Sequence, residues 1–255
     1  MARVFITGST DGLGRAAAEA LLDDGHAVVL HARSRARTAA VQDIAPRAAG
    51  VVVGDLSDAD ETRHVAEQVN ALGRMDAVIH NAGVYLTNGR AATEQGHPTT
   101  LAVNTLAPYL LTALIRRPQR LIYLSSGMHR GGTPAVNDIE WTDRRWNASR
   151  AYSDSKLYVT TLAFAVARHW PDVMSHAVDP GWVPTKMGGA GAPDDLEAGY
   201  CTQTWLAVSS EPAALVSGHY WHHRRPESAL AVASGSGFQD ALIARLEELT
   251  GVSLF

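Results

Sequence analysis

Short apolar stretches alternate with longer segments of helical character along most of this 255-residue chain. The apolar stretches are hydrophobic throughout, which is typical of strands that are buried on both faces of a parallel sheet. The first segment between two such stretches is rich in alanine and leucine and ends at a glycine, as many helices do. The predicted strands are 3–7, 27–31, 51–53, 77–80, 120–125 and 174–178, and the predicted helices are 15–24, 58–72, 97–115, 152–169 and 238–250.

This alternation predicts the fold class. Strands separated by helix-length segments form βαβ units, whose helices cover both faces of a parallel sheet. No internal repeat, low-complexity tract or linker-like block divides the chain. We therefore expect an α/β fold in which residues 1–255 form a single domain, a Rossmann-type doubly wound parallel sheet with helices on both faces. Loop-rich composition predicts insertions near residues 130–150 and 186–215.

The amino-acid composition limits the kinds of molecule that this protein is expected to bind. The chain has 22 Lys and Arg against 26 Asp and Glu, a net charge of −4, which argues against binding to nucleic acid or to an anionic membrane. A single cysteine excludes an internal disulfide and suits a reducing compartment. No apolar run approaches the ~20 residues of a membrane span, and the N-terminus has no signal-peptide pattern. We expect a soluble cytoplasmic protein with no nucleic-acid partner.

The sequence TGSTDGLG at residues 7–14 lies between the first predicted strand and the first predicted helix. Glycines let the backbone turn tightly and approach a pyrophosphate, and the helix N-terminus offers free N–H groups and a positive dipole end. A glycine-rich turn without a ligand is the alternative interpretation. The position of the loop, at the first strand-to-helix junction of an alternating chain, favours a dinucleotide site.

Further motifs follow in register with the ends of the predicted strands. In chain order they are Asp55-Leu56, Asn81-Ala82-Gly83, Asn104, Ser125-Ser126, Tyr152-x-x-x-Lys156 and Pro180-Gly181-Trp182-Val183-Pro184-Thr185. With the TGxxxGxG spacing of the glycine loop, these motifs make the chain resemble the short-chain dehydrogenase/reductase family over nearly its whole length. His80 is a small departure, because the family often has asparagine at that position.

The resemblance implies a bound nicotinamide dinucleotide. It places Asp55 at the adenine amino group, residues 81–83 along the adenosine, and Thr185 with the backbone near Val183 at the carboxamide. The residues expected at the cofactor are Gly8, Ser9, Thr10, Asp11, Gly12, Leu13, Gly14, Arg33, Ser34, Asp55, Leu56, Asn81, Ala82, Gly83, Tyr152, Lys156, Pro180, Gly181, Val183 and Thr185.

The end of the second predicted strand bears on the choice between NAD and NADP. An acidic side chain there holds the ribose hydroxyls of NAD, whereas a basic one accepts the 2′-phosphate of NADP. Ala32 stands where the acid would be, and Arg33, Arg35 and Arg37 follow. A guanidinium suits phosphate oxygens, although arginines often only solvate a loop. We expect NADP(H) to be preferred, with NAD as the alternative.

Tyr152 and Lys156 lie four residues apart on a predicted helix and share one of its faces. A free phenol has a pKa near 10 and is a poor base at neutral pH. A nearby ammonium and a pyridinium ring would both stabilise the phenolate and lower that pKa. Taken alone the spacing is common by chance, but downstream of the cofactor loop it predicts that Tyr152 is the general acid/base.

The resemblance assigns two further catalytic roles. Ser126 would hydrogen-bond the substrate oxygen, because it matches the second serine of the family's paired motif, while Ser125 is the competing candidate. Asn104 would bend its helix and order a water that links Lys156 to solvent, and a helix-capping amide is the simpler interpretation. Lys156 would also bind the hydroxyls of the nicotinamide ribose.

Residues 137–141 and 151–157 resemble the retinol-dehydrogenase-like branch of the family, which implies a small lipophilic carbonyl or alcohol substrate. The predicted insertions would lie on the substrate side. The segment before the fifth predicted strand is short, which suggests a trimmed helix. Because that helix often contributes to oligomer contacts in the family, a homo-oligomer is neither expected nor excluded. The candidates for lining an apolar substrate pocket are Trp141, Trp146, Trp182, Met187, Tyr200 and Trp205. The alternative for each is a place in the core, which aromatic side chains fill more often than they contact ligands.

The primary hypothesis is an NADP(H)-dependent carbonyl reductase or alcohol dehydrogenase with Tyr152 as general acid/base. A non-catalytic dinucleotide-binding regulator is one alternative, and the complete Ser/Tyr/Lys set argues against it. An epimerase or dehydratase of related fold is another, which the glycine spacing and short chain disfavour. We expect no metal site, because the His222-His223 pair lacks partners at ligand spacing.

Overall fold

One eight-stranded sheet forms the centre of the protein, for which a computed structural model describes residues 1–85 and 89–255. The strand order is β3-β2-β1-β4-β5-β6-β7-β8, and every neighbouring pair is parallel except β7 with β8. The chain order reverses between β1 and β4, which is where open α/β sheets bind ligands. The strands are β1 (Arg3–Ile6), β2 (Ala27–Ala32), β3 (Gly50–Val53), β4 (Ala77–His80), β5 (Arg120–Leu124), β6 (Met174–Asp179), β7 (His219–His222) and β8 (Arg225–Glu227).

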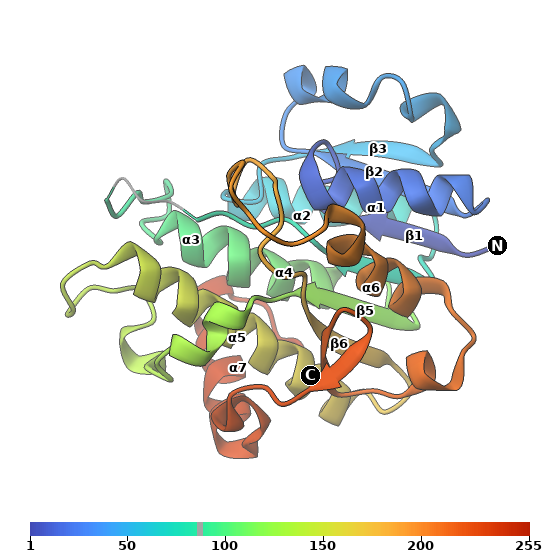
Figure 1. Cartoon of the computed structure of the whole chain (residues 1–255). Helices are drawn as coiled ribbons and strands as arrows, with labels where there is room; N and C mark the ends of the chain where they lie inside the picture. The colour runs from blue at the N-terminus through green and yellow to red at the C-terminus, as the bar shows by residue number, and fades with distance from the viewer. Residues whose placement is uncertain (86–88) are drawn as a thin grey trace.

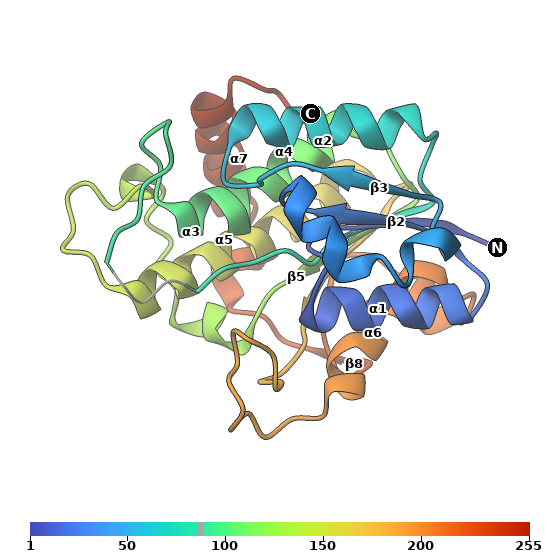
Figure 2. The same ribbon diagram turned by 90° about the horizontal axis from the view of Figure 1, so that it is seen from above.

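Helices cover both faces of this sheet, as expected (Figures 1 and 2). Side chains alternate between the faces, so Phe5 packs in one core cluster while Val4 and Ile6 pack in the other. One face carries α2 (Ala59–Ala71), α4 (Ala107–Leu114), α5 (Ala148–His169) and α7 (Ser236–Thr250), and the other carries α1 (Gly12–Asp23) and α6 (Leu196–Val208).

Side-chain caps explain where the helices begin. The carboxylate of Asp58 accepts hydrogen bonds from the first turn of α2, and Asp195 does the same for α6. Asn147 accepts from the Arg150 N–H, so α5 begins at Ala148 and not at Tyr152 as the sequence predicted. Tyr152 therefore lies in the second turn of a long, well-anchored helix.

Two parts of the fold differ from the sequence prediction. The helical segment expected over 97–115, with breaks at Pro98 and Pro108, is instead divided by a π-helical stretch: it consists of α3 (Thr99–Leu101), η3 (Ala102–Leu106) and α4. The region expected as an insertion near 186–215 contains α6, which packs on the sheet beside α1. Strand β8 was not predicted either. Among the described residues, no helix combines the length and apolarity that a membrane span needs.

Candidate active site

The glycine loop lies at the carboxyl end of β1, at the point where the strand order reverses. Gly8 and Gly12 have positive φ angles of +65° and +50°, which favour glycine. A Cβ on Gly14 would lie 2.3 Å from Asn81 Nδ2 and 2.5 Å from the Gly8 carbonyl oxygen. The loop therefore needs its glycines, and its backbone is free to approach a pyrophosphate at the start of α1.

Two residues of the predicted Asn81-Ala82-Gly83 motif hold this loop in place. The Asn81 side chain donates to the Thr7 carbonyl oxygen at 2.9 Å. The Ala82 N–H donates to the Thr7 hydroxyl, also at 2.9 Å. The end of β4 is thus joined to the end of β1 across the switch point.

His31 also holds the loop, and the sequence analysis missed it. Its Nδ1 accepts from the Gly8 N–H at 2.9 Å, its Nε2 donates to the Gly54 carbonyl oxygen at 2.8 Å, and its own N–H donates to the Ser9 hydroxyl at 2.8 Å. Burial lowers the pKa of His31, which favours this neutral tautomer. A histidine in the otherwise apolar β2 was the only sequence signal.

The basic residues after β2 take different positions. Arg33 has an exposed side chain, and no ion pair or hydrogen bond is found for it within the described ranges. Arg37 instead lies 3.7 Å from the carboxylate of Asp11, in the glycine loop. Lys186 hydrogen-bonds the same carboxylate and is the largest cause of the lowered pKa of Asp11.

Other predicted cofactor residues lie around the same edge. The Asp55 carboxylate accepts from the N–H and hydroxyl of Ser57, and Leu56 is buried. A Cβ on Gly12 would lie 3.2 Å from Thr185, so the loop after β6 returns to the glycine loop. Val183, in that loop, is buried.

Tyr152 and Lys156 face the carboxyl end of β5 from α5. Lys156 Nζ donates to the Leu124 carbonyl oxygen at 2.7 Å and lies 5.6 Å from the centre of the Tyr152 ring. Burial lowers the pKa of Lys156 to about 8, and the charge of Asp179 opposes that shift. The pair is thus assembled on one face of the helix, as its spacing predicted.

The direction of the Tyr152 pKa shift differs from the sequence expectation. Burial, the largest cause, raises the pKa of Tyr152 to about 12, and a hydrogen bond with Ser126 opposes it. Side chains of the protein alone therefore favour the neutral phenol, which is a proton donor. The neighbouring cation is visible in the sequence, whereas the loss of water around the ring depends on the fold.

The two adjacent serines have different surroundings. Ser125 is 2% exposed, and its hydroxyl lies 2.6 Å from the hydroxyl of Thr160, which is on α5. Ser126 is partly exposed, and its hydroxyl accepts from the Met128 N–H at 3.2 Å. Of the two serines, Ser126 is the one that lowers the pKa of the Tyr152 phenol.

Asn104 lies in the π-helical stretch η3, which widens the helix at this residue. Its Oδ1 accepts from the Val84 N–H at 2.8 Å, and its Nδ2 donates to the Val84 carbonyl and the Ser155 hydroxyl, both at 3.0 Å. A Cβ on Gly83 would lie 3.4 Å from both Asn104 Oδ1 and Lys156 Nζ. Gly83 thus leaves room for the amide and the ammonium to approach each other.

Only part of the expected apolar pocket lies at Tyr152. The sulfur of Met187 is 3.9 Å from the Tyr152 hydroxyl, and Trp182, in the same loop, is 59% exposed. Tyr85, which the sequence analysis did not select, has its ring centre 4.8 Å from that of Tyr152. Met187 and Tyr85 thus place a thioether and an aromatic ring beside Tyr152.

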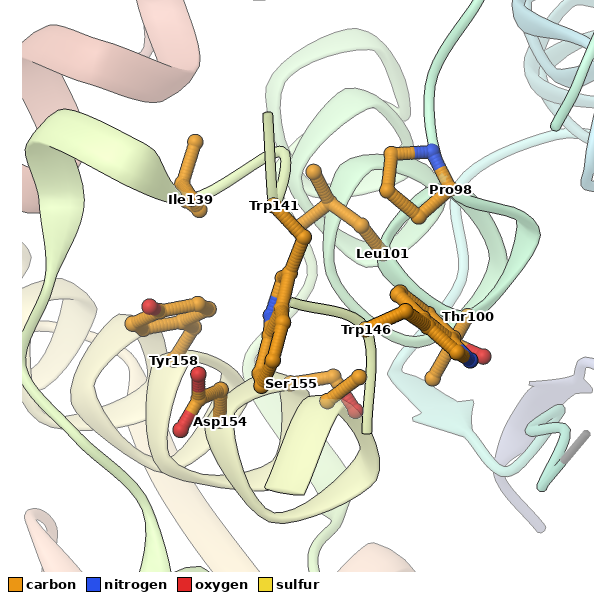
Figure 3. A pocket seen from close by; sticks show the side chains of 10 residues that line it. Pro98, Thr100, Leu101, Ile139, Trp141, Trp146, Asp154, Ser155 and Tyr158 are labelled. Carbon is orange, nitrogen blue, oxygen red and sulfur yellow. The ribbon is translucent and has the colours of Figure 1, made fainter. Parts of the chain in front are cut away.

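The other aromatic candidates are packed elsewhere. Trp205 is buried against Trp221 in the core beneath α6, and Tyr200 packs against the same core. Trp141 and Trp146 line a small cavity on another side of α5, where Trp141 stands between Tyr158 and Trp146 (Figure 3). In the segment near 130–150, Trp141 is therefore buried and Trp146 is half-buried against it, on the side of α5 that carries Asp154 and Tyr158.

No group of three or more His, Cys, Asp or Glu side chains suited to a metal ion is found in residues 1–85 and 89–255. His222 and His223 stack on each other with ring centres 3.9 Å apart.

Comparisons with known proteins agree with this arrangement. A family model described as short chain dehydrogenase matches residues 2–195. The chain is 40% identical to short-chain dehydrogenase chyC of Penicillium rubens, covering 100% of this chain and 99% of that protein. It is 32% identical to a Streptomyces protein provisionally named a daunorubicin C-13 ketoreductase, covering 98% and 92%, and 30% identical to human retinol dehydrogenase 13, covering 72% and 60%.

Solved structures share the fold. A crystal structure of an uncharacterised protein from Mycobacterium paratuberculosis superposes with a TM-score of 0.84 at 26% identity, covering 100% of this chain and 95% of that one. An NADPH-dependent 3-quinuclidinone reductase from Rhodotorula rubra superposes with a TM-score of 0.68 at 20% identity, covering 87% and 89%.

Proposed function

The chain belongs to the short-chain dehydrogenase family, whose members catalyse NAD(P)-dependent oxidoreduction, and we propose from this premise that it interconverts a carbonyl compound and an alcohol with NADP(H). The observation that carries the proposal is the convergence of Tyr152, Lys156 and Ser126 at the edge of the sheet that also holds the glycine loop. The regulator and epimerase alternatives have no comparable observation in their favour.

Each residue has a distinct part in the proposed reaction. The nicotinamide, when bound, supplies or accepts the hydride. Ser126 hydrogen-bonds the substrate oxygen beside Tyr152, whose hydroxyl donates the proton during reduction and whose phenolate accepts it during oxidation. Lys156 binds the ribose hydroxyls, and Asn104 connects it to an ordered water. The glycine loop binds the pyrophosphate through the N-terminus of α1.

The surroundings of Tyr152 support a lipophilic substrate. Met187 and Tyr85 present a thioether and an aromatic ring to Tyr152, and Trp182 is exposed in the same loop as Met187. The provisional name of the Streptomyces relative, a ketoreductase, fits this substrate class. NADP is proposed over NAD because Arg33 is exposed where a 2′-phosphate would be recognised, and no acid stands at Ala32.

A reductase screen tests the proposal. Aromatic and aliphatic ketones and aldehydes are incubated with the protein and either NADPH or NADH, and oxidation of the cofactor is followed by absorbance. We expect turnover of lipophilic carbonyls with NADPH favoured. Tight NADPH binding without turnover of any carbonyl or alcohol would support the regulator instead, and an NADH preference would contradict the role of Arg33.

A further inference from the structure

A buried carboxylate that no catalytic role has used lies at the end of β6. Asp179 is 8% exposed. Its Oδ2 accepts from the Tyr220 hydroxyl of β7 at 3.0 Å, and its Oδ1 accepts from the Gly181 N–H at 3.0 Å. These two bonds fix the carboxylate between the edge of the sheet and the loop that carries Trp182 and Met187.

This carboxylate lies beside the chain segment that follows Ser126. A Cβ on Gly127, the residue after Ser126, would lie 3.1 Å from Asp179 Oδ2. The charge of Asp179 opposes the loss of the proton from both Lys156 and Tyr152. A fully buried ammonium needs an opposite charge or strong hydrogen bonds to stay charged, and Leu124 supplies only a neutral carbonyl.

We propose that Asp179 is a positioning residue for the Tyr152–Lys156 pair, whose anchored negative charge keeps the Lys156 ammonium charged and the Tyr152 phenol protonated. The inference rests on the proposed carbonyl reduction and concerns the proton that it uses. In reduction, the Tyr152 O–H bond breaks and its proton goes to the carbonyl oxygen, while the carbonyl carbon receives the hydride and the cofactor is oxidised. A charge that retains this proton keeps the donor form of Tyr152 present up to a higher pH.

Other charged and titratable groups face the same region. Arg130 lies with its Cζ 5.3 Å from the Tyr220 ring centre and pairs with Glu227 at 3.1 Å. His222 Nδ1 lies 3.9 Å from Asp179 Oδ2. Among the described residues, the titratable and charged groups in this region also include Tyr85, His129, Arg130, Tyr220 and Glu227.

The test compares removal of the charge with removal of its anchor. Asp179→Asn and Asp179→Ser both remove the charge. Two such variants are used so that the test still stands if one of them fails to fold. Tyr220→Phe is the matched control, because it deletes the hydrogen bond but leaves the carboxylate. We expect the alkaline limb of kcat for carbonyl reduction to move to lower pH by roughly one unit in the uncharged variants, and to stay in place in Tyr220→Phe.

A second readout needs no turnover. The carbon next to Lys156 Nζ is followed by ¹³C NMR as the pH is changed, with a Lys156→Arg protein to assign the signal. We expect Lys156 to titrate at lower pH in both uncharged variants than in the wild type. If neither variant moves this titration, or if Tyr220→Phe moves it equally, Asp179 only ties β6 to β7 and the inference is wrong. If the wild type reduces no carbonyl, but Lys156 still titrates at lower pH in the uncharged variants than in the wild type, only the proposed function is overturned.

Discussion

The cofactor side and the catalytic side of the site are held by different physical means. Neutral groups hold the start of the glycine loop: His31 Nδ1 accepts from the Gly8 N–H, Asn81 donates to the Thr7 carbonyl oxygen and the Ala82 N–H donates to the Thr7 hydroxyl, each at 2.9 Å. The catalytic side instead buries charge, with Lys156 on α5 and Asp179 on β6. Changes on the first side should therefore alter shape and affinity for the cofactor, whereas changes on the second should alter rate and pH dependence.

The largest expected effect comes from the catalytic side. Tyr152→Phe removes the proton donor and leaves the packing of the ring against Tyr85 and Met187 in place. General acid/base catalysis contributes about 10²–10⁴-fold, so kcat should fall by that factor while the Kd for NADPH, measured by fluorescence titration, changes little. An unchanged kcat would remove Tyr152 from the mechanism.

The two serines sharpen the comparison within one strand end. Ser126→Ala should lower kcat by about 10²-fold, because a hydrogen bond to the developing charge on the substrate oxygen is lost. Ser125→Ala should instead lower the free energy of unfolding by ~1 kcal/mol, since it breaks the buried bond to Thr160. Steady-state kinetics and urea denaturation separate the two, and the opposite pattern would exchange the roles of the serines.

On the cofactor side, Gly14→Ala should act through shape. The added methyl meets Asn81 Nδ2 and the Gly8 carbonyl, and the resulting strain of ~2 kcal/mol should raise the Kd for NADPH by about thirtyfold. Gly237→Ala is the control, because a Cβ there meets no described atom within 4 Å, and it should stabilise α7 slightly. Equal affinity in both variants would contradict the close approach of the loop.

The smallest expected effect concerns selectivity for the cofactor. Arg33→Ala should weaken NADPH relative to NADH by about tenfold, or ~1.4 kcal/mol, because the exposed guanidinium would no longer meet the 2′-phosphate. Arg37→Ala is the matched change, since Arg37 already faces Asp11. A larger loss in Arg37→Ala would move phosphate recognition to that residue.

Sequence reasoning worked where local pattern decides the structure. The apolar strands, the glycine loop at the end of β1, and the Tyr152–Lys156 spacing on a helix each depend on residues near one another in the chain. Helix α6 was missed because apolar and aromatic side chains, including Tyr200 and Trp205, leave little polar periodicity along it.

Features that depend on contacts between distant segments could not be predicted. His31 reaches Gly8 across 23 positions, and Tyr220 reaches Asp179 across 41. The raised pKa of Tyr152 follows from burial, which a spacing of four residues does not reveal. The tryptophans of the 130–150 segment were placed at the substrate by composition, whereas packing against α5 decides their position.

The most direct test of the central claim follows the hydride itself. The protein is given a lipophilic ketone that it consumes and NADPH that carries deuterium on the reactive carbon of the nicotinamide, and the alcohol is examined by mass spectrometry and NMR. The account predicts one deuterium on the carbinol carbon for each NADPH oxidised, with product formation slowed by Tyr152→Phe. An alcohol without deuterium, or NADPH that stays bound and unoxidised with every carbonyl offered, would contradict it.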